Sequence, residues 1–216
     1  MGPNKTELAA KRKSQSWRAV ILTLWMAVGL GAAETKTAVF FGDSLTAGYG
    51  VDPDEAYPAL IQKKIDQAKL PWRVVNAGLS GETTAGGLRR LDWILRQRVD
   101  LIVIELGGND GLRGIAPATT RSNLEAMIQR IRQKHPDVRV VVAGMQLPTN
   151  MGPEHTREFA AIYPEVARAG GAVLIPFLLE GVGGVPSLNL PDGIHPTPQG
   201  HALVADTVWA TIRPLL

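Results

Sequence analysis

The loop sequence PDGIHPTPQGH at residues 191–201 holds a carboxylate and an imidazole close together, Asp192 and His195. Its prolines restrict the backbone, so the two side chains can converge on one point. Asp192 can then orient one ring nitrogen of His195, while the other nitrogen accepts a proton from a hydroxyl group. The pair therefore predicts a general base for nucleophilic chemistry.

The same Asp-x-x-His spacing also occurs in metal sites, which need three or four converging ligands. The chain has no HExxH motif, and we interpret its other histidines as surface or packing residues: His135, His155 and His201. We therefore expect no catalytic metal. Because the chain contains no cysteine, disulfide frameworks, thiolate catalysis and thiolate zinc sites are excluded.

Ser44 is the candidate nucleophile. It lies in FFGDSLTAGYG, two residues after the apolar run ends at Gly42, where the chain turns from a predicted strand into a helix. Backbone amides at such a turn can stabilise an anion on an attacked acyl group. The surrounding sequence is not the G-x-S-x-G motif of α/β-hydrolases. Two alternatives remain open, because Ser44 can be a helix cap and Ser80 is a competing serine.

Gly81 and Asn109 are candidate donors to such an anion. Gly81, in LSGETTAGG, suits a left-handed turn that leaves its amide free to donate. Asn109, in LGGND, presents side-chain N–H groups without charge. The alternative for Asn109 and Asp110 is a simple turn, in which Asp110 hydrogen-bonds locally and holds Asn109 in place.

Short apolar runs alternate with segments of helical period from residue 37 onward, which predicts successive βαβ units and a parallel sheet. We expect five strands, at residues 37–42, 73–76, 101–106, 139–144 and 172–176. We expect helices near residues 56–68, 84–98, 119–135, 155–169 and 197–212. Each candidate residue follows a predicted strand or precedes the last helix, which is the edge where α/β sheets bind ligands.

The first 33 residues differ from the remainder. They hold five of the 23 basic residues and one of the 20 acidic residues, so the rest of the chain carries 18 basic and 19 acidic side chains. That balance gives no electrostatic case for nucleic-acid binding. Residues 11–18 are basic and polar, and residues 19–33 form an apolar run that ends in small residues. We interpret residues 1–33 as a secretory signal peptide, or alternatively an uncleaved anchor, preceding one domain at residues 34–216. Both interpretations predict a periplasmic or secreted protein.

Four segments together resemble the blocks of the GDSL or SGNH hydrolase family, and the resemblance runs from Val39 to the C-terminus: FGDSLTAGYG, NAGLSGETTAGGL, ELGGNDGLRG and DGIHPTPQGH. IELGGNDGLRG, with LSGETT before it, is especially similar to the bacterial periplasmic branch with acyl-CoA thioesterase, lysophospholipase and arylesterase activities. The resemblance implies an α/β fold, a flavodoxin-like three-layer α/β/α sandwich with a five-stranded parallel sheet.

The resemblance also implies roles for the candidate residues. Ser44 would be the nucleophile, His195 the base and Asp192 its partner. The amides of Ser44 and Gly81 and the side chain of Asn109 would form the oxyanion hole. Ester or thioester hydrolysis by these groups requires no cofactor.

Apolar residues that could line an acyl channel, or equally pack in the core, favour fatty-acyl or aryl esters over sugar acetates as substrates: Leu79, Leu112, Ile115, Leu147, Met151 and Phe177. The segment 147–159 is expected to shape this pocket. A carbohydrate O-acetyl esterase is the alternative enzyme, and a periplasmic binding module that uses the same sheet edge is an alternative from another class. An FMN-binding flavodoxin is disfavoured, because the first loop lacks a Ser/Thr-rich phosphate cradle. We expect no membrane span in the mature chain and a monomer.

Overall fold

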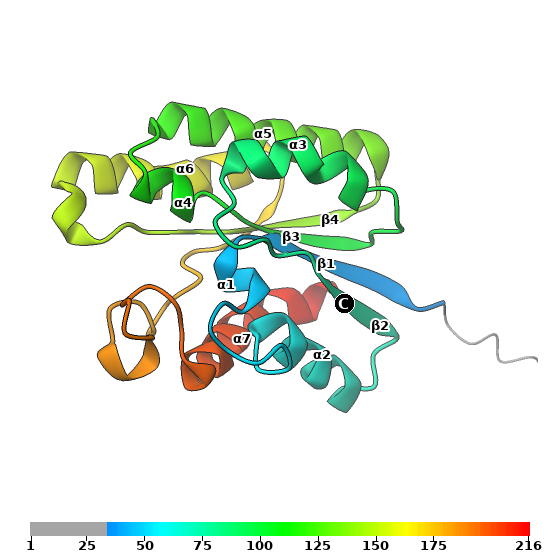
Figure 1. Cartoon of the computed structure of the whole chain (residues 1–216). Helices are drawn as coiled ribbons and strands as arrows, with labels where there is room; N and C mark the ends of the chain where they lie inside the picture. The colour runs from blue at the N-terminus through cyan, green and yellow to red at the C-terminus, as the bar shows by residue number, and fades with distance from the viewer. Residues whose placement is uncertain (1–33) are drawn as a thin grey trace, which may run out of the picture. The chain divides into compact units, whose positions relative to one another are not determined.

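A parallel sheet of five strands forms the centre of the computed structural model, which describes residues 34–216 (Figure 1). Its strands are β1 (Lys36–Gly42), β2 (Trp72–Asn76), β3 (Leu101–Glu105), β4 (Arg139–Ala143) and β5 (Val173–Ile175). Their order in the sheet is β2-β1-β3-β4-β5, and every neighbouring pair is parallel. The predicted signal peptide or anchor, residues 1–33, lies outside the described residues.

The central strands are apolar on both faces because helices cover both faces of the sheet. All five residues of β3 are buried, and β1 is buried from Thr37 to Gly42. The edge strands β2 and β5 include half-buried and exposed residues. This gradient of burial explains why the central strands read as continuous hydrophobic runs.

Helices form one layer on each side of the sheet. In Figure 1, α3 (Thr84–Ile94), α4 (Gly108–Leu112), α5 (Pro117–Lys134) and α6 (Pro153–Ala169) lie above the sheet. The helices α1 (Ser44–Ala47), α2 (Tyr57–Gln67) and α7 (Pro198–Ile212) lie below it. Three short 3₁₀ helices complete the described elements, at Thr149–Met151, Pro186–Leu188 and Arg213–Leu215. The predicted three-layer α/β/α sandwich is therefore confirmed.

The helix boundaries differ from the prediction at several points. A helix was expected over residues 84–98, but α3 ends at Ile94. The turn that follows places Leu95 and Val99 in the core, so the apolar residues there keep a helix-like spacing without being helical. The helices α5 and α6 begin at prolines, whose fixed φ suits the first helical position. The helices α1 and α4 have four and five residues, too few for periodicity to predict.

Within residues 34–216, no helix is both long enough and apolar enough to span a bilayer. The carboxyl ends of the strands meet at one edge of the sheet, on the left in Figure 1. Ser44, Gly81 and Asn109 follow β1, β2 and β3 at this edge, with Ser44 in α1, Gly81 in the loop after β2 and Asn109 in α4.

Candidate active site

Three side chains form a continuous line of hydrogen bonds at this edge. His195 Nε2 lies 2.8 Å from Ser44 Oγ, and His195 Nδ1 lies 2.7 Å from Asp192 Oδ2. Ser44 is the first residue of α1, directly after β1, while the other two residues lie in the loop before α7. The structure thus brings together the predicted nucleophile and base across 151 positions of the sequence.

Asp192 is held by its own loop. Its Oδ1 accepts hydrogen bonds from the backbone N–H groups of Ile194 and His195, at 2.9 and 3.0 Å. Partial burial acts to raise the pKa of Asp192, but the backbone hydrogen bonds and the His195 imidazole lower it from 3.8 to about 2. The carboxylate therefore stays ionised at neutral pH and directs the second ring nitrogen of His195 toward Ser44.

An aromatic ring lies against the imidazole. The rings of Tyr49 and His195 have centroids 4.6 Å apart, with a tilt of 43° between their planes. Tyr49 is not among the candidate residues predicted from the sequence. Tyr49 lies between Gly48 and Gly50, in the same motif as Ser44. Two glycines around one residue indicate an unusual backbone conformation, and both have a positive φ in the structure.

The three predicted anion donors face one cleft. The backbone N–H groups of Ser44 and Gly81 donate no hydrogen bond to any group in residues 34–216, and Gly81 has a φ of 77°. The side-chain amide of Asn109 donates one hydrogen bond to Asp43 Oδ2, at 2.9 Å, which leaves its second N–H group to donate elsewhere. All three residues line the same cleft.

Asp43, rather than Asp110, holds Asn109 in place. Asp43 also caps α1, because its Oδ1 accepts a hydrogen bond from the Leu45 N–H at 3.1 Å. The interpretation that Asp110 holds Asn109 in place is therefore wrong. Asp110 is fully buried and accepts hydrogen bonds from the backbone and hydroxyl groups of Thr84, so it ties α4 to the start of α3.

A buried carboxyl pair supports the turn that carries Ser44. Glu105 Oε2 accepts hydrogen bonds from the Asp43 N–H at 3.1 Å and the Thr46 hydroxyl at 2.7 Å. Burial raises the pKa of Asp43 from 3.8 to about 6, while hydrogen bonds from Leu45 and Asn109 oppose the shift. Burial, and then the charge of Asp43, raise the pKa of Glu105 well above its usual value. The pair therefore holds a proton within the core.

Close packing around this carboxyl pair also requires a glycine at position 42. A Cβ atom at Gly42 would overlap the Thr46 hydroxyl, the Glu105 carboxyl group and the Glu105 carbonyl oxygen. All three groups are backbone or fully buried, so they have no room to shift. Only glycine lets β1 end this close to β3, and the turn into Ser44 depends on that approach.

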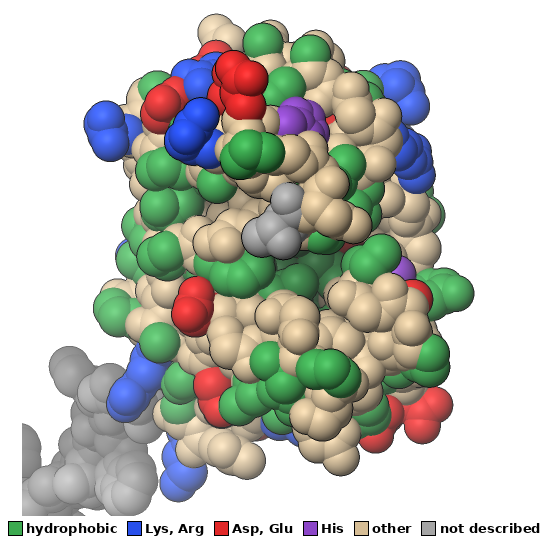
Figure 2. Space-filling view, turned by 90° about the vertical axis from the view of Figure 1, so that its left-hand side faces the viewer, with side chains coloured by type: hydrophobic (Ala, Val, Ile, Leu, Met, Phe, Trp, Pro, Cys, Tyr) green, Lys and Arg blue, Asp and Glu red, His purple; other side chains and the backbone are tan. Residues whose placement is uncertain are grey.

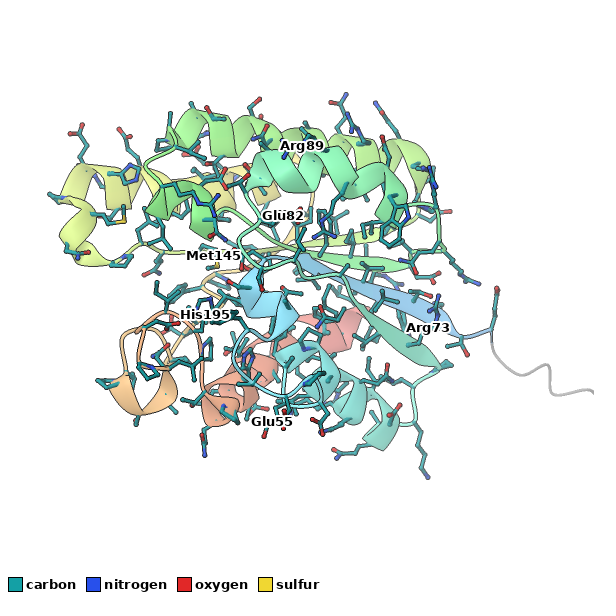
Figure 3. The ribbon with its side chains drawn as sticks, viewed as in Figure 1. Glu55, Arg73, Glu82, Arg89, Met145 and His195 are labelled. Atoms are coloured by element: carbon teal, nitrogen blue, oxygen red, sulfur yellow. The ribbon has the colours of Figure 1, made fainter. Side chains whose placement is uncertain are left out.

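The cleft has a volume of about 600 Å³. Figure 2 shows this face of the molecule, with hydrophobic side chains gathered around the hollow. Met145 and His195 lie at the same end of the sheet (Figure 3) and both line the cleft. Its other large apolar lining residues are Leu45, Tyr49, Leu112, Leu147, Phe177, Leu179 and Ile194.

This lining agrees in part with the acyl-channel residues expected from the sequence. Leu112, Leu147 and Phe177 line the cleft, whereas the other three expected residues do not: Leu79, Ile115 and Met151. Among the side chains of segment 147–159 that the structure describes, Leu147 and Pro148 alone line the cleft, because α6 begins at Pro153 and packs on the sheet. Apolar character alone does not distinguish a cleft wall from the core or a loop surface.

The remaining histidines make contacts elsewhere. His135 Nε2 lies 3.0 Å from the Leu95 carbonyl oxygen, and His201 Nδ1 accepts a hydrogen bond from the Tyr57 N–H at 3.3 Å. Burial lowers the pKa of His201 to about 4, so its ring is neutral. Ser80 lines the cleft, but the imidazole of His195 pairs with Ser44. In the described part of the chain, no group of three or more His, Cys, Asp or Glu side chains could hold a metal ion.

The protein is a parallel α/β/α sandwich, and serine, imidazole and carboxylate groups lie in line at the carboxyl edge of its sheet. This combination is typical of hydrolases. Residues 40–203 match the GDSL-like Lipase/Acylhydrolase family, which covers most of the chain. The chain therefore belongs to the GDSL-like lipase/acylhydrolase family and is a hydrolase of ester bonds.

Individual relatives agree with this assignment. The chain is 43% identical to "Esterase TesA" of Pseudomonas aeruginosa over 92% of its own length and 100% of the relative. It is 38% identical to "Thioesterase 1/protease 1/lysophospholipase L1" of Escherichia coli over 86% of its own length and 87% of the relative. A crystal structure of TesA matches 84% of this chain and 100% of its own, with a TM-score of 0.81 and 44% identity.

Proposed function

We propose that this protein is a serine esterase that cleaves carboxylic ester and thioester bonds of acyl substrates through an acyl-enzyme on Ser44. The observation that carries the proposal is the hydrogen-bonded line from Ser44 Oγ through His195 to Asp192, at 2.8 and 2.7 Å, of which Ser44 and His195 line an apolar cleft. A hydroxyl group paired with a neutral imidazole, itself oriented by a carboxylate, is an activated nucleophile.

In the first step, His195 Nε2 removes the proton of Ser44 as Oγ attacks the carbonyl carbon of the substrate. The electron pair of the C=O bond moves to oxygen, which accepts hydrogen bonds from the amides of Ser44 and Gly81 and the side chain of Asn109. The ionised carboxylate of Asp192 stabilises the imidazolium that forms.

In the second step, the imidazolium gives its proton to the leaving alcohol or thiol as the C–O or C–S bond breaks. Water then attacks the acyl group on Ser44 with His195 as base, and the acid is released by the same route. In each half of the reaction His195 accepts one proton and then gives it up, so it ends in its neutral form.

The cleft favours acyl chains and aryl groups over sugars. Its large side chains are mostly apolar, and beyond Asp43 and the groups used by the reaction its polar side chains are Ser80 and Gln146. The names of the relatives, an esterase and a thioesterase/lysophospholipase, point in the same direction. Esters, lysophospholipids and thioesters are therefore the proposed substrate class, and a carbohydrate O-acetyl esterase is not favoured.

The proposed site of action is the periplasm or the extracellular space. The support lies in the sequence of residues 1–33, where a basic segment precedes an apolar run with small residues at its end. Outside the cytoplasm the enzyme meets lysophospholipids and small esters more readily than acyl-CoA. We therefore rank esterase or lysophospholipase activity above thioesterase activity as the physiological role.

The test is hydrolysis of a p-nitrophenyl ester series from acetate to palmitate by the purified protein and by two variants. We expect Ser44→Ala to lose turnover by about 10³-fold or more, and Ser80→Ala, which removes the rival serine, to retain most of it. An active Ser44→Ala variant would refute the assignment. A preference for medium or long acyl chains would support the proposed substrates. Turnover of the acetate ester alone would instead favour a deacetylase activity.

A further inference from the structure

Arg90, on the face of α3 that packs toward the sheet, joins chain segments that meet at the cleft. Its Nε donates to both carboxylate oxygens of Glu82, at 2.8 and 2.7 Å, and its Nη2 donates to the carbonyl oxygens of Ala77 at 2.8 Å and Gly42 at 3.3 Å. The guanidinium also lies 4.3 Å from the ring centre of Phe41. The Glu82 side chain is only 4% exposed and that of Arg90 22%, so solvent screens this ion pair weakly.

The segments that Arg90 joins carry two of the three proposed oxyanion donors. Gly42 ends β1 two residues before Ser44, and Glu82 directly follows Gly81. One guanidinium group therefore contacts both the segment that presents the Ser44 amide and the segment that presents the Gly81 amide. Figure 3 shows Glu82 between α3 and the sheet, above the level of His195.

Few other contacts hold Gly81. The loop after β2 is tied to β1 at its start, where the Ala77 and Leu79 N–H groups donate to the carbonyl oxygens of Phe40 and Gly42. Beyond that point, the Glu82 N–H closes a turn on Leu79, and an exposed Arg113 donates to the Gly81 carbonyl oxygen at 2.9 Å. The ion pair of Arg90 with Glu82 is therefore the buried side-chain contact directly next to Gly81.

We propose that Arg90 is a positioning residue that, with Glu82, sets the separation between the Ser44 and Gly81 amides of the oxyanion hole. This inference rests on the proposed function. A guanidinium suits the task because its planar fork binds a carboxylate through two parallel N–H groups and keeps donors for the carbonyl oxygens. Lysine has the charge but not this fixed geometry, so Arg90→Lys isolates the geometry from the charge.

The effect is expected in the transition state. A misplaced donor weakens the bond to the oxyanion, which forms only as the carbonyl carbon becomes tetrahedral, and leaves ground-state binding in the apolar cleft intact. We expect Arg90→Lys to lower kcat by about 10- to 100-fold with KM changed by less than about threefold, because losing a whole donor costs about 10²- to 10³-fold. Glu82→Gln keeps the size of the side chain and should show a smaller fall of the same kind.

The experiment compares the parent protein with Arg90→Lys, Glu82→Gln and a matched control, Arg89→Lys. Arg89 is the exposed neighbour on the same helix (Figure 3), and its variant should match the parent. Active sites are first counted by stoichiometric release of p-nitrophenol from a p-nitrophenyl phosphonate, so that kcat is expressed per competent site. A purely structural role would reduce the number of sites and leave kcat per site unchanged, and that result would overturn the proposal.

A second measurement uses an alkyl trifluoromethyl ketone as a probe of the hole. Ser44 Oγ would add to its carbonyl carbon, the serine proton would pass to His195, and the ketone oxygen would become an oxyanion with no leaving group. We expect its inhibition constant to rise by the same factor as kcat/KM falls in both variants. An unchanged inhibition constant, in variants with full site counts, would also overturn the proposal. If the parent itself shows no activity that depends on Ser44, the proposed function fails instead, so the two failures are distinguishable.

Discussion

Replacing Asn109 with alanine tests the proposed oxyanion hole most directly. The side-chain amide of Asn109 has two N–H groups, and one of them is used by Asp43 Oδ2 at 2.9 Å. That hydrogen bond fixes the amide plane before the substrate binds, so we expect the second N–H to meet the developing oxyanion without reorganising. Asn109→Ala removes this N–H from the cleft and leaves Ser44, His195 and Asp192 in place.

The magnitude follows from the loss of one preorganised donor of three. Such a loss costs about 10²- to 10³-fold in kcat, or about 2.7–4 kcal/mol of transition-state stabilisation. The structural cost is smaller, about 1–3 kcal/mol, because Asp43 loses one hydrogen bond. The loss of the Asn109 bond also moves the pKa of Asp43 further upward, so protonation of this buried carboxyl group relieves part of that cost. The variant should therefore remain folded at 25 °C.

The assay is kcat and KM for p-nitrophenyl butyrate per titrated active site, with circular dichroism to verify the fold. The side chain of the companion variant Asn109→Asp has nearly the same shape, but it places a second carboxyl group against Asp43. Its negative charge would also repel the oxyanion that develops in the cleft. We expect it to be less active than Asn109→Ala, by about tenfold, because like charges in contact shift toward sharing one proton. A folded Asn109→Ala variant with less than a tenfold loss of kcat, or the reverse order of the two variants, would refute the reasoning.

Three further predictions concern ionisation. Asp192→Asn should lower kcat by about 10³-fold, because an amide no longer favours the His195 tautomer that faces Ser44, and a loss below tenfold would argue against this role. The kcat/KM of the parent should fall in acid, because a general base must be unprotonated to accept the serine proton, while Asp192, with a pKa of about 2, stays ionised; a flat profile from about pH 5 to 8 would contradict a histidine base. Because burial raises the pKa of Asp43 from 3.8 to about 6, its contribution to stability is complete below about pH 3.8 and is lost as the pH rises through about 6. The melting temperature of Asp43→Asn should therefore improve relative to that of the parent between pH 4 and 8, and parallel curves would speak against the raised pKa.

The sheet could be predicted from the sequence because its strands are buried on both faces. In 101–106 and 139–144 nearly every residue is apolar, and helical segments separate them, a pattern that favours parallel strands. The helix ends were less predictable, since the turn after Ile94 keeps apolar residues directed at the core without helical geometry. The short helices α1 and α4 have no periodic signal at all.

The candidate residues could also be predicted, because the carboxyl ends of parallel strands lie at one edge. Ser44, Gly81 and Asn109 follow three such ends, so their positions along the chain are enough to bring them to a common cleft. Asp192 and His195 needed only local spacing and a restricted loop. The apolar wall was predicted less well, because an apolar side chain in a loop can face the cleft, the core or solvent.

Local sequence pattern therefore predicts the five strands, the five longer helices and the chemistry of the residues that follow the strand ends. Only the tertiary structure decided which side chains support those residues. Asp43 pairs with Asn109 across 66 positions and Glu105 with Thr46 across 59, while Arg90 contacts the Gly42 carbonyl oxygen across 48. Such contacts depend on how the helices and the sheet pack against one another. The periodicity of the sequence indicates which side chains are buried, but not which residue in another element each one contacts. The residues that react are set by local pattern, whereas those that position them are set by packing.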